Sequence, residues 1–444
     1  MAKLREYSKW FTVGIGVKRW LLLMLFGTAL IAAGLSLGIL KTVVGQDQVA
    51  AFTQASWVAV VTTLAAGIAL VLLSVLRLGR NLVQPYRRHQ QGAVVDVVFA
   101  HSRRQKGFKL VAIGGGTGLP SVLRGLKPIT SNITAVVTVA DDGGSSGRLR
   151  RDLNVLPPGD LRNNIAALAD DESLMTRLFQ YRFSQGDLDG HAFGNLFISA
   201  LAGVTGSLEA ALIETARVLN IQGRVLPATL DDVTLCATVR LPGNNEAVKI
   251  CGESKITAAG GRIERIEIAP ATVTAYSESV QAILDADLVI LGPGSLYTSI
   301  LPNLVVAGIA EALRATAAYK LYVCNVATQP GETTGYTVAD HVLALEEHIG
   351  RGMFQAVLAN NHYPPLDEVS RRTRFVQPAP DGHPVLQRYD VRYVDLVDEA
   401  RPWRHDPGKL ATAILAITEG EKHQTGTRPA LVGIGEQPGE HRSI

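Results

Sequence analysis

The chain has 444 residues, which is enough for two soluble domains or for one large α/β domain with additional segments. Its net charge is only +3 and the basic residues form no long tract, so nucleic acid is not expected as a partner. The three cysteines, Cys236, Cys251 and Cys324, are an odd number without CxxC spacing, and we therefore expect buried, reduced thiols in a cytosolic fold.

Two uncharged apolar segments, residues 20–40 and 56–76, lie near the start of the chain. Each is about as long as the ~20 residues that a helix needs to cross a bilayer. A secretory signal peptide, with cleavage near Ala32, is the alternative for the first segment. Its apolar run is longer than a usual signal core, however, and an equal run follows. We therefore predict a transmembrane helical hairpin within residues 1–80.

Basic residues flank the outer ends of this hairpin. The connection, residues 41–55, holds a single Lys and a single Asp, whereas the flanks contain Lys3, Arg5, Lys9, Lys18 and Arg19 before the first segment and Arg77, Arg80, Arg87 and Arg88 after the second. The positive-inside rule places both flanks in the cytoplasm. The prediction is a multi-pass protein of the cytoplasmic membrane whose C-terminal domain lies in the cytoplasm.

The rest of the chain divides into a linker over residues 81–107, a compact domain over 108–419 and a polar, disordered tail over 420–444. Four short apolar runs in the domain predict buried strands: 109–113, 133–140, 287–291 and 320–326. Helical stretches lie between them, at 161–169, 207–219 and 303–317. The alternation predicts a Rossmann-like, three-layer α/β fold with a mostly parallel sheet, and residues 223–268 predict a small antiparallel insertion.

Each predicted strand is followed by a loop of unusual chemistry. The loops are Gly114–Gly118, "DDGGSSG" from Asp141, Gly292–Ser299 and residues 327–333. In a parallel sheet these loops share the carboxyl edge, where open α/β sheets bind ligands. Turn formation alone would explain any one loop, but not four together. The first loop lacks the third Gly of the dinucleotide fingerprint and the Lys-Ser/Thr ending of a Walker motif, so NAD(P) is not expected.

The loop residues indicate a phosphate-containing ligand. Backbone N–H groups and Thr117 of the first loop favour phosphate. The third loop repeats the arrangement, with Ser295 as an expected N-cap and Tyr297 available to stack on a ring. Of the adjacent pair Asp141 and Asp142, we expect one side chain to face the ligand and the other to orient the loop. A Mg²⁺ ligand, an acceptor for sugar hydroxyls, a general base and an Asx turn all stay open.

Three further stretches complete the expected site. Arg148 is the arginine expected to meet phosphate. Asp160 reads as a helix N-cap, and Arg162 in the first helical turn would need a nearby anion. His191 heads an apolar helix without metal-binding spacing. The complete set of expected ligand-binding residues is Gly114, Gly115, Gly116, Thr117, Gly118, Asp141, Asp142, Ser145, Ser146, Arg148, Arg162, Asn163, His191, Asn195, Gly294, Ser295, Tyr297, Asn325, Thr328 and Gln329.

Six sequence blocks resemble the gluconeogenesis factor (YvcK-like) family of the CofD superfamily. They are "AIGGGTGLPSVLRGLK", "TVADDGGSSGRLR", "PPGDLRN", "GHAFGNLFI", "GPGSLYTSILPNL" and "NVATQPGET", and the likeness covers residues 108–416. The resemblance implies a nucleotide-binding domain for UDP-sugars such as UDP-N-acetylglucosamine. It also implies a role in cell shape, cell-wall synthesis and growth on gluconeogenic carbon sources.

The resemblance also assigns roles to single residues. The transferase branch implies a substrate site at Gly115–Gly118 and Mg²⁺ at Asp142, and Tyr297 looks similar to a UDP-sugar-binding tyrosine of the YvcK-like branch. The N-terminal hairpin is a departure from compact cytosolic members. We expect a membrane-tethered UDP-sugar-binding regulator, with cell-wall synthesis proteins and a second copy of the chain as partners. A Mg²⁺-dependent 2-phospho-L-lactate transferase is the alternative, and a nicotinamide-dependent oxidoreductase is disfavoured by the failed fingerprint.

Overall fold

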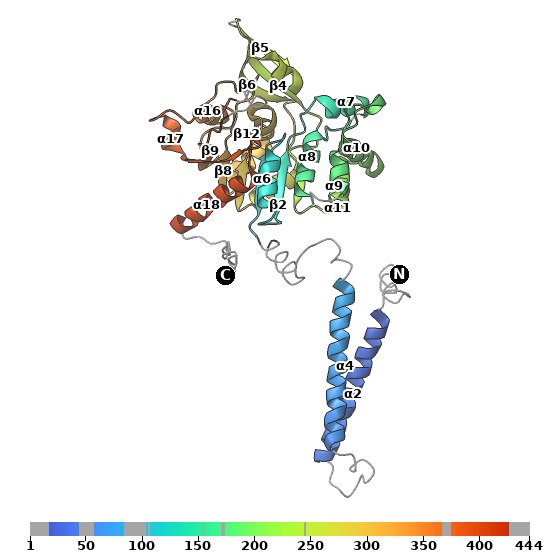
Figure 1. Ribbon diagram of the computed structural model, residues 1–444. Coiled ribbons are helices and arrows are strands. Elements are labelled where there is room, and N and C mark those ends of the chain that lie inside the picture. The colour runs from blue at the N-terminus through green and yellow to red at the C-terminus, as the bar shows by residue number, and fades with distance from the viewer. Residues whose placement is uncertain are drawn as a thin grey trace. The chain divides into compact units, whose positions relative to one another are not determined.

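The computed structural model describes residues 17–43, 57–83, 104, 107–153, 155–169, 174–243, 246–365 and 374–425. The chain divides into two compact units, residues 1–101 and 102–444, and Figure 1 shows the helices and strands of each. Most of the predicted linker, and the tail beyond residue 425, lie outside the described residues.

The N-terminal unit is a pair of packed helices, α2 (Val17–Val43) and α4 (Trp57–Val83). Both are long and apolar enough to cross a membrane, over Arg19–Thr42 and Trp57–Arg77, which confirms the two predicted segments. Glycines let the backbones approach closely, since a Cβ on Gly67 would lie 2.8 Å from the carbonyl oxygen of Gly27.

Cations and tryptophans pair at both ends of this hairpin. Lys41 Nζ lies 5.5 Å from the centre of the Trp57 ring, and the guanidinium of Arg77 lies 5.7 Å from that of Trp20. Tryptophan and basic residues are typical of the ends of membrane spans, where an amphipathic ring meets the headgroup region. The hairpin therefore has the end chemistry of a membrane-spanning pair.

The C-terminal unit is built on one seven-stranded sheet of order β10-β9-β8-β7-β1-β2-β3, in which every described pairing is parallel. The strands are β1 (Leu110–Gly114), β2 (Ile133–Val137), β3 (Arg224–Pro227), β7 (Leu288–Leu291), β8 (Tyr319–Val323), β9 (Ala356–Asn360) and β10 (Asp390–Val394). The central strands β1, β2 and β7 are buried throughout because helices cover both faces. The predicted α/β class is confirmed.

Helices form the outer layers of this unit. They are α6 (Leu119–Leu126), α7 (Gly144–Leu153), α8 (Gly159–Leu168), α9 (Leu174–Gln180), α10 (Phe193–Thr205), α11 (Leu208–Val218), α13 (Ser277–Leu284), α14 (Leu301–Leu304), α15 (Ala307–Ala315), α16 (Val338–Ile349), α17 (Pro384–Arg388) and α18 (Pro407–Thr425). Helices α18, α6 and α8 pack in a row, whereas α13 packs on α15. The crossover from β1 to β2 through α6 and the crossover from β7 to β8 through α15 run in opposite directions along the sheet. Because such crossovers are right-handed, these two groups of helices lie on opposite faces.

A small antiparallel sheet of order β5-β4-β6 forms the predicted insertion and lies at the top of the unit in Figure 1. It consists of β4 (Thr234–Arg240), β5 (Ala247–Cys251) and β6 (Arg262–Ala269), with α12 (Glu253–Ala259) between the last two. The expected start of the insertion at residue 223 is wrong, because β3 pairs with β2 as the edge of the main sheet. A short antiparallel pair, β11 (Val397–Asp398) and β12 (Arg401–His405), precedes α18.

Several other boundaries differ from expectation. The helix predicted over 303–317 is divided between α14 and α15, and the helical segment Leu296–Leu304, which ends with α14, meets α15 at an angle of 73°. The second strand ends at Val137, before the polar loop, and α18 continues to Thr425, past the predicted start of the tail. Cys236 and Cys251 form a disulfide across β4 and β5, so the expectation of reduced thiols is wrong for this pair, whereas Cys324 is free and buried. The two cysteines meet because they are register partners on neighbouring strands, and the sequence around each cysteine does not reveal that pairing.

Candidate functional site

The order of the main sheet reverses between β1 and β7, which is the topological switch point where open α/β sheets bind ligands. Side-chain amides tie the loops together at this point. Asn303 donates to the carbonyl oxygens of Gly114 (3.0 Å) and Ser299 (2.7 Å). Asn325 accepts from Gly294 N at 3.0 Å and donates to Gly294 O at 2.7 Å. The loops after β1, β7 and β8 therefore form one surface.

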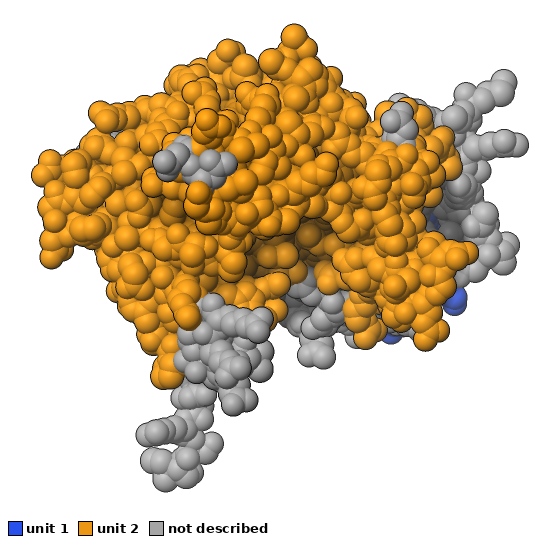
Figure 2. Space-filling view, turned by 90° about the horizontal axis from the view of Figure 1, so that it is seen from above, with its two compact units in different colours: residues 1–101 blue, residues 102–444 orange. Residues whose placement is uncertain are grey.

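A cleft of about 580 Å³ opens at this surface. Figure 2, which looks down on the top of Figure 1, shows this side of the unit hollowed near its centre. The cleft is lined by Thr117, Gly118, Ser121, Gly294, Ser295, Asn325, Val326, Ala327, Thr328, Gln329, Pro330, Trp403, Arg404 and His405. Seven of the expected residues thus meet here: Thr117, Gly118, Gly294, Ser295, Asn325, Thr328 and Gln329.

One wall of the cleft comes from β12, which the sequence reasoning missed. Trp403 is 41% exposed and offers a ring to the cleft. His405 is buried, its Nε2 lies 3.1 Å from the carbonyl oxygen of Cys324, and burial lowers its pKa to about 4, so the ring is neutral near pH 7. Arg404 is therefore the cation of this wall. The sequence of this strand, "RPWRH", contains no motif that would have identified it as part of a binding site.

Two residues that line the cleft each carry a buried side-chain atom without a hydrogen-bond partner within the described part of the chain. These atoms are Arg404 Nε and Gln329 Oε1. Gln329 is oriented by its other amide atom, because Nε2 donates to Ser295 Oγ at 2.5 Å. Leaving a buried polar group unpaired costs about 1–3 kcal/mol, so a ligand that accepts from Arg404 and donates to Gln329 would recover this cost.

A group of five carboxyl groups, which we call the carboxyl cluster, lies around the loops after β1 and β2 and the start of α12: Asp141, Asp142, Asp160, Glu253 and Glu332. Asp160 is not the N-cap predicted for it. Helix α8 begins after Pro158 without a side-chain cap, and Asp160 Oδ2 instead accepts from Gly116 N at 2.8 Å. Gly116 has φ of +63°, a conformation that favours glycine.

The two adjacent aspartates, Asp141 and Asp142, accept hydrogen bonds from different segments. Asp141 Oδ1 accepts from Gly143 N at 2.8 Å and so orients its own loop. Asp142 Oδ1 accepts from both the backbone N and Oγ of Ser254, each at 2.9 Å, and ties the loop to α12. We expected one aspartate to orient the loop, and Asp141 does so. The expectation that the other aspartate faces a ligand stays a prediction.

Burial and mutual repulsion raise the pKa of several carboxyl groups in the cluster. Burial, with repulsion from Asp141 and Asp160, raises the pKa of Glu253 to about 9. Burial and repulsion from Asp141 raise the pKa of Asp160 to about 7. Burial also raises the pKa of Glu332, whose Oε1 accepts from Thr298 Oγ1 at 3.2 Å. Near pH 7 the cluster therefore holds protons and does not carry its full negative charge.

The donor set does not form a ready metal site. Among the described residues, no group of three or more His, Cys, Asp or Glu side chains is placed to hold a metal ion. One carboxylate oxygen of Asp142 already accepts two hydrogen bonds from Ser254. The residues present therefore do not fit the Mg²⁺ that the resemblance implies at Asp142, and we derive no chemistry through it.

Four expected polar residues make contacts within the fold. Ser145 Oγ lies 3.1 Å from His191 Nδ1 and accepts from Asn195 Nδ2 at 3.1 Å, a buried network that joins α7 to α10. Arg148 donates to the carbonyl oxygen of Asp189 at 2.6 Å. These contacts join α7 to α10 and to the loop before it, and none of these four residues lines the cleft.

Other expected residues are placed differently from the prediction. Tyr297 is 2% exposed and its hydroxyl lies 2.9 Å from that of Tyr336, so the ring is not available to stack on a ligand. Ser295 makes no cap hydrogen bond to the helical turn that follows it. Arg162, in contrast, has the nearby anion expected for it: it is 9% exposed, donates to Asn163 Oδ1 at 2.8 Å and attracts the carboxyl group of Asp160. The missed residues Glu253 and Glu332 lie in the insertion and at the end of the fourth loop, far apart in sequence.

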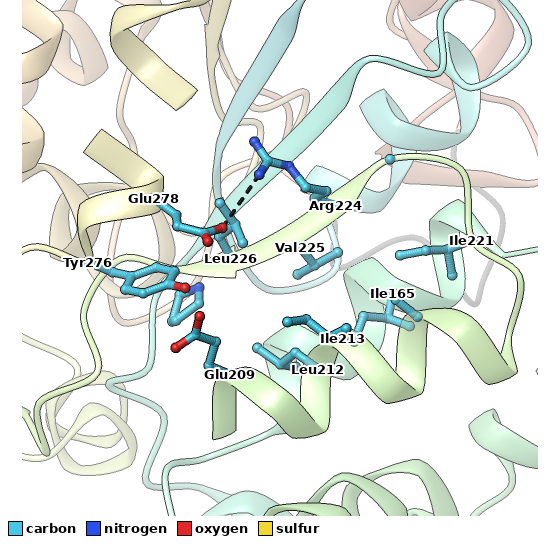
Figure 3. Close-up of a pocket in the computed structure, with 13 residues that line it drawn as sticks. Ile165, Glu209, Leu212, Ile213, Ile221, Arg224, Val225, Leu226, Tyr276 and Glu278 are labelled. Atoms are coloured by element: carbon cyan, nitrogen blue, oxygen red, sulfur yellow. Dashed lines mark hydrogen bonds and ion pairs between the residues drawn. The ribbon is translucent and has the colours of Figure 1, made fainter. Parts of the chain in front are cut away.

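A second cavity, of about 260 Å³, lies against the edge strand β3 and is not the candidate site (Figure 3). Its lining is mainly aliphatic, with Leu212 and Ile213 of α11 facing Val225 across it. Arg224 and Glu278 form an ion pair of 3.5 Å there. No loop at the carboxyl edge of the central strands contributes to it.

The chain is similar to known proteins over this whole unit. Residues 110–394 match the family model described as 2-phospho-L-lactate transferase CofD. The gluconeogenesis factor of Bacillus subtilis is 48% identical over 70% of this chain and 98% of its own length. A Nostoc protein that carries the same name provisionally is 43% identical over 95% of this chain and 94% of its own length.

The fold agrees with a solved structure. A UPF0052-family protein of Bacillus halodurans matches with a TM-score of 0.64 and 40% identity, over 70% of this chain and 99% of that one. The Nostoc relative matches almost the full chain, whereas the Bacillus proteins match only about the length of the C-terminal unit. This chain belongs to the CofD family and, within it, to the gluconeogenesis factors.

Proposed function

We propose that the cleft binds a nucleotide sugar, UDP-N-acetylglucosamine, and that the protein acts as a regulator without turnover of its own. The observation that carries the proposal is that two residues lining a cleft of about 580 Å³, Arg404 and Gln329, each have a buried polar atom without a partner among the described residues, Nε and Oε1. A diphosphate accepts from a guanidinium, and a uracil or sugar N–H donates to an amide oxygen. Trp403 supplies a face on which a ring can stack.

The backbone of the cleft also suits a phosphate. Gly118 packs against the third loop, where a Cβ would lie 2.6 Å from the carbonyl oxygen of Pro293. It directly precedes α6, whose first turn contributes Ser121 to the cleft. The N–H groups at the start of a helix favour an anion. A nucleotide sugar therefore meets donors from both the loops and the wall.

The biological setting follows from the family and the hairpin. We propose that α2 and α4 anchor the protein in the cytoplasmic membrane with the cleft on the cytoplasmic side. There it would respond to a cell-wall precursor and act on cell-wall synthesis proteins, cell shape and growth on gluconeogenic carbon. The carbon-source role rests on the naming of the relatives. A homodimer is part of this proposal and is tested by light scattering.

Calorimetric titration of the full chain in detergent tests the ligand. UDP-N-acetylglucosamine should bind more tightly than GDP or NAD⁺, and R404A should lose about ten- to a hundredfold in affinity, as expected for a lost charged hydrogen bond. R401A, which removes an exposed arginine of the same strand, should bind like wild type. Equal affinity for all three ligands would contradict the proposal.

A second candidate is phospho-acyl transfer, because the matched family model is a 2-phospho-L-lactate transferase. The carboxyl cluster would supply a general base to an acceptor hydroxyl. Incubation of a phospho-lactyl nucleotide with an acceptor alcohol, followed by mass spectrometry, separates the candidates. Product formation that D142N abolishes would favour the transferase.

A further inference from the structure

We propose that the Cys236–Cys251 disulfide is a reversible thiol switch that sets how α12 holds the loops after β2 and β8, the second of which lines the cleft. The two cysteines are direct register partners on β4 and β5, with Cα atoms 4.0 Å apart. Cys236 is 2% exposed, whereas Cys251 is exposed at the end of β5. Cys251 is therefore the cysteine of the pair at which a thiolate from solvent would attack.

The disulfide lies directly before the segment that reaches the carboxyl cluster. Gly252 follows Cys251 with φ of +106°, and its N–H donates to the carbonyl oxygen of Leu235 at 2.8 Å. Ser254 then donates twice to Asp142, at the loop after β2.

Further along the same helix, Thr257 Oγ1 donates to Glu332 Oε1 at 3.5 Å, in the loop after β8. Helix α12 thus joins two loops of the carboxyl edge, and its first residues are fixed by the bond to β4.

The reaction is an exchange with a dithiol reductant. One thiolate of the reductant attacks Sγ of Cys251, the Cys236–Cys251 bond breaks, and Cys236 leaves as a thiolate that takes a proton. The second thiol of the reductant then displaces Cys251 from the mixed disulfide. Two electrons and two protons pass to the protein and the reductant becomes a disulfide. The predicted cytoplasmic location supplies dithiols of this class.

Reduction removes the covalent bond between β4 and the residue that leads into α12, so the Ser254–Asp142 contact opens more often. Opening is local, because the remaining β4–β5 and β4–β6 pairs are not touched. We infer that the affinity for UDP-N-acetylglucosamine falls about tenfold when the disulfide is reduced, which is within the usual range of coupling between two sites. This inference rests on the proposed function.

The test compares the full chain in detergent after treatment with glutathione disulfide and after dithiothreitol. Thiol alkylation under denaturing conditions should label Cys324 alone in the first state and all three cysteines in the second. Amide exchange of residues 252–258 should be faster in the reduced protein. The C236S/C251S variant should match the reduced state under both treatments, and C324S should switch like wild type.

The possible outcomes test the thiol switch and the proposed ligand separately. Labelling of all three cysteines after oxidation, or equal exchange of residues 252–258 in both states, would overturn the switch. Faster exchange with an unchanged affinity for UDP-N-acetylglucosamine would overturn its control of the cleft. If neither state binds this ligand, the proposed function fails while the exchange comparison still decides the switch.

Discussion

Replacing Glu253 by glutamine should remove a pH dependence of the stability of the C-terminal unit. Burial, with repulsion from neighbouring carboxylates, raises the pKa of Glu253 from 4.5 to about 9. The folded protein therefore keeps a proton that the unfolded chain releases. This contribution to stability is fully present below pH 4.5 and is lost as the pH rises through about 9. Inside that window, one proton lowers the free energy of unfolding by about 1.4 kcal/mol for each pH unit.

Urea denaturation of the fragment 102–444, which contains the whole compact unit, measures this slope. From about pH 6 to about pH 7.5 the free energy of unfolding of wild type should fall by about 2 kcal/mol more than that of E253Q. The matched control is E311Q, at an exposed glutamate of α15, which should run parallel to wild type. Parallel profiles for E253Q and wild type would show that Glu253 is ionised in the fold and refute the reasoning.

Four other predictions concern the loops and the hairpin. G116V places a branched side chain at φ of +63°, with its Cβ 3.0 Å from Ser299 Oγ, and calorimetry should show at least about tenfold weaker binding of UDP-N-acetylglucosamine. G144A, at a positive φ but in open space, should bind like wild type; equal losses would indicate backbone strain alone. D142N keeps an oxygen acceptor for Ser254 but removes its charge and should cost about 1 kcal/mol of stability by urea denaturation, and no change would mean that the contact is not populated. The fragment 102–444 should bind the nucleotide sugar like the full chain, and reporter fusions after Arg88 should be active only on the cytoplasmic side; the opposite results would contradict the tether and its topology.

The sequence alone determined the features that depend on local composition. Two uncharged runs of membrane-spanning length predicted α2 and α4, and both are confirmed as helices long enough to cross a membrane. Four β-branched runs predicted β1, β2, β7 and β8, because strands buried on both faces need apolar residues throughout. The order of these strands and helices also predicted a parallel sheet whose carboxyl edge gathers the polar loops.

Only the tertiary structure decided which polar side chains meet at that edge. Asp160 looked like a helix cap and instead binds Gly116 N, while Ser254 reaches Asp142 from the insertion. Arg404 joins the cleft from β12, and Cys236 meets Cys251 through strand register. Helix and strand periodicities describe neighbours a few residues apart. Contacts between distant segments depend on the order of the strands and on the path of each loop, which no short stretch of sequence contains.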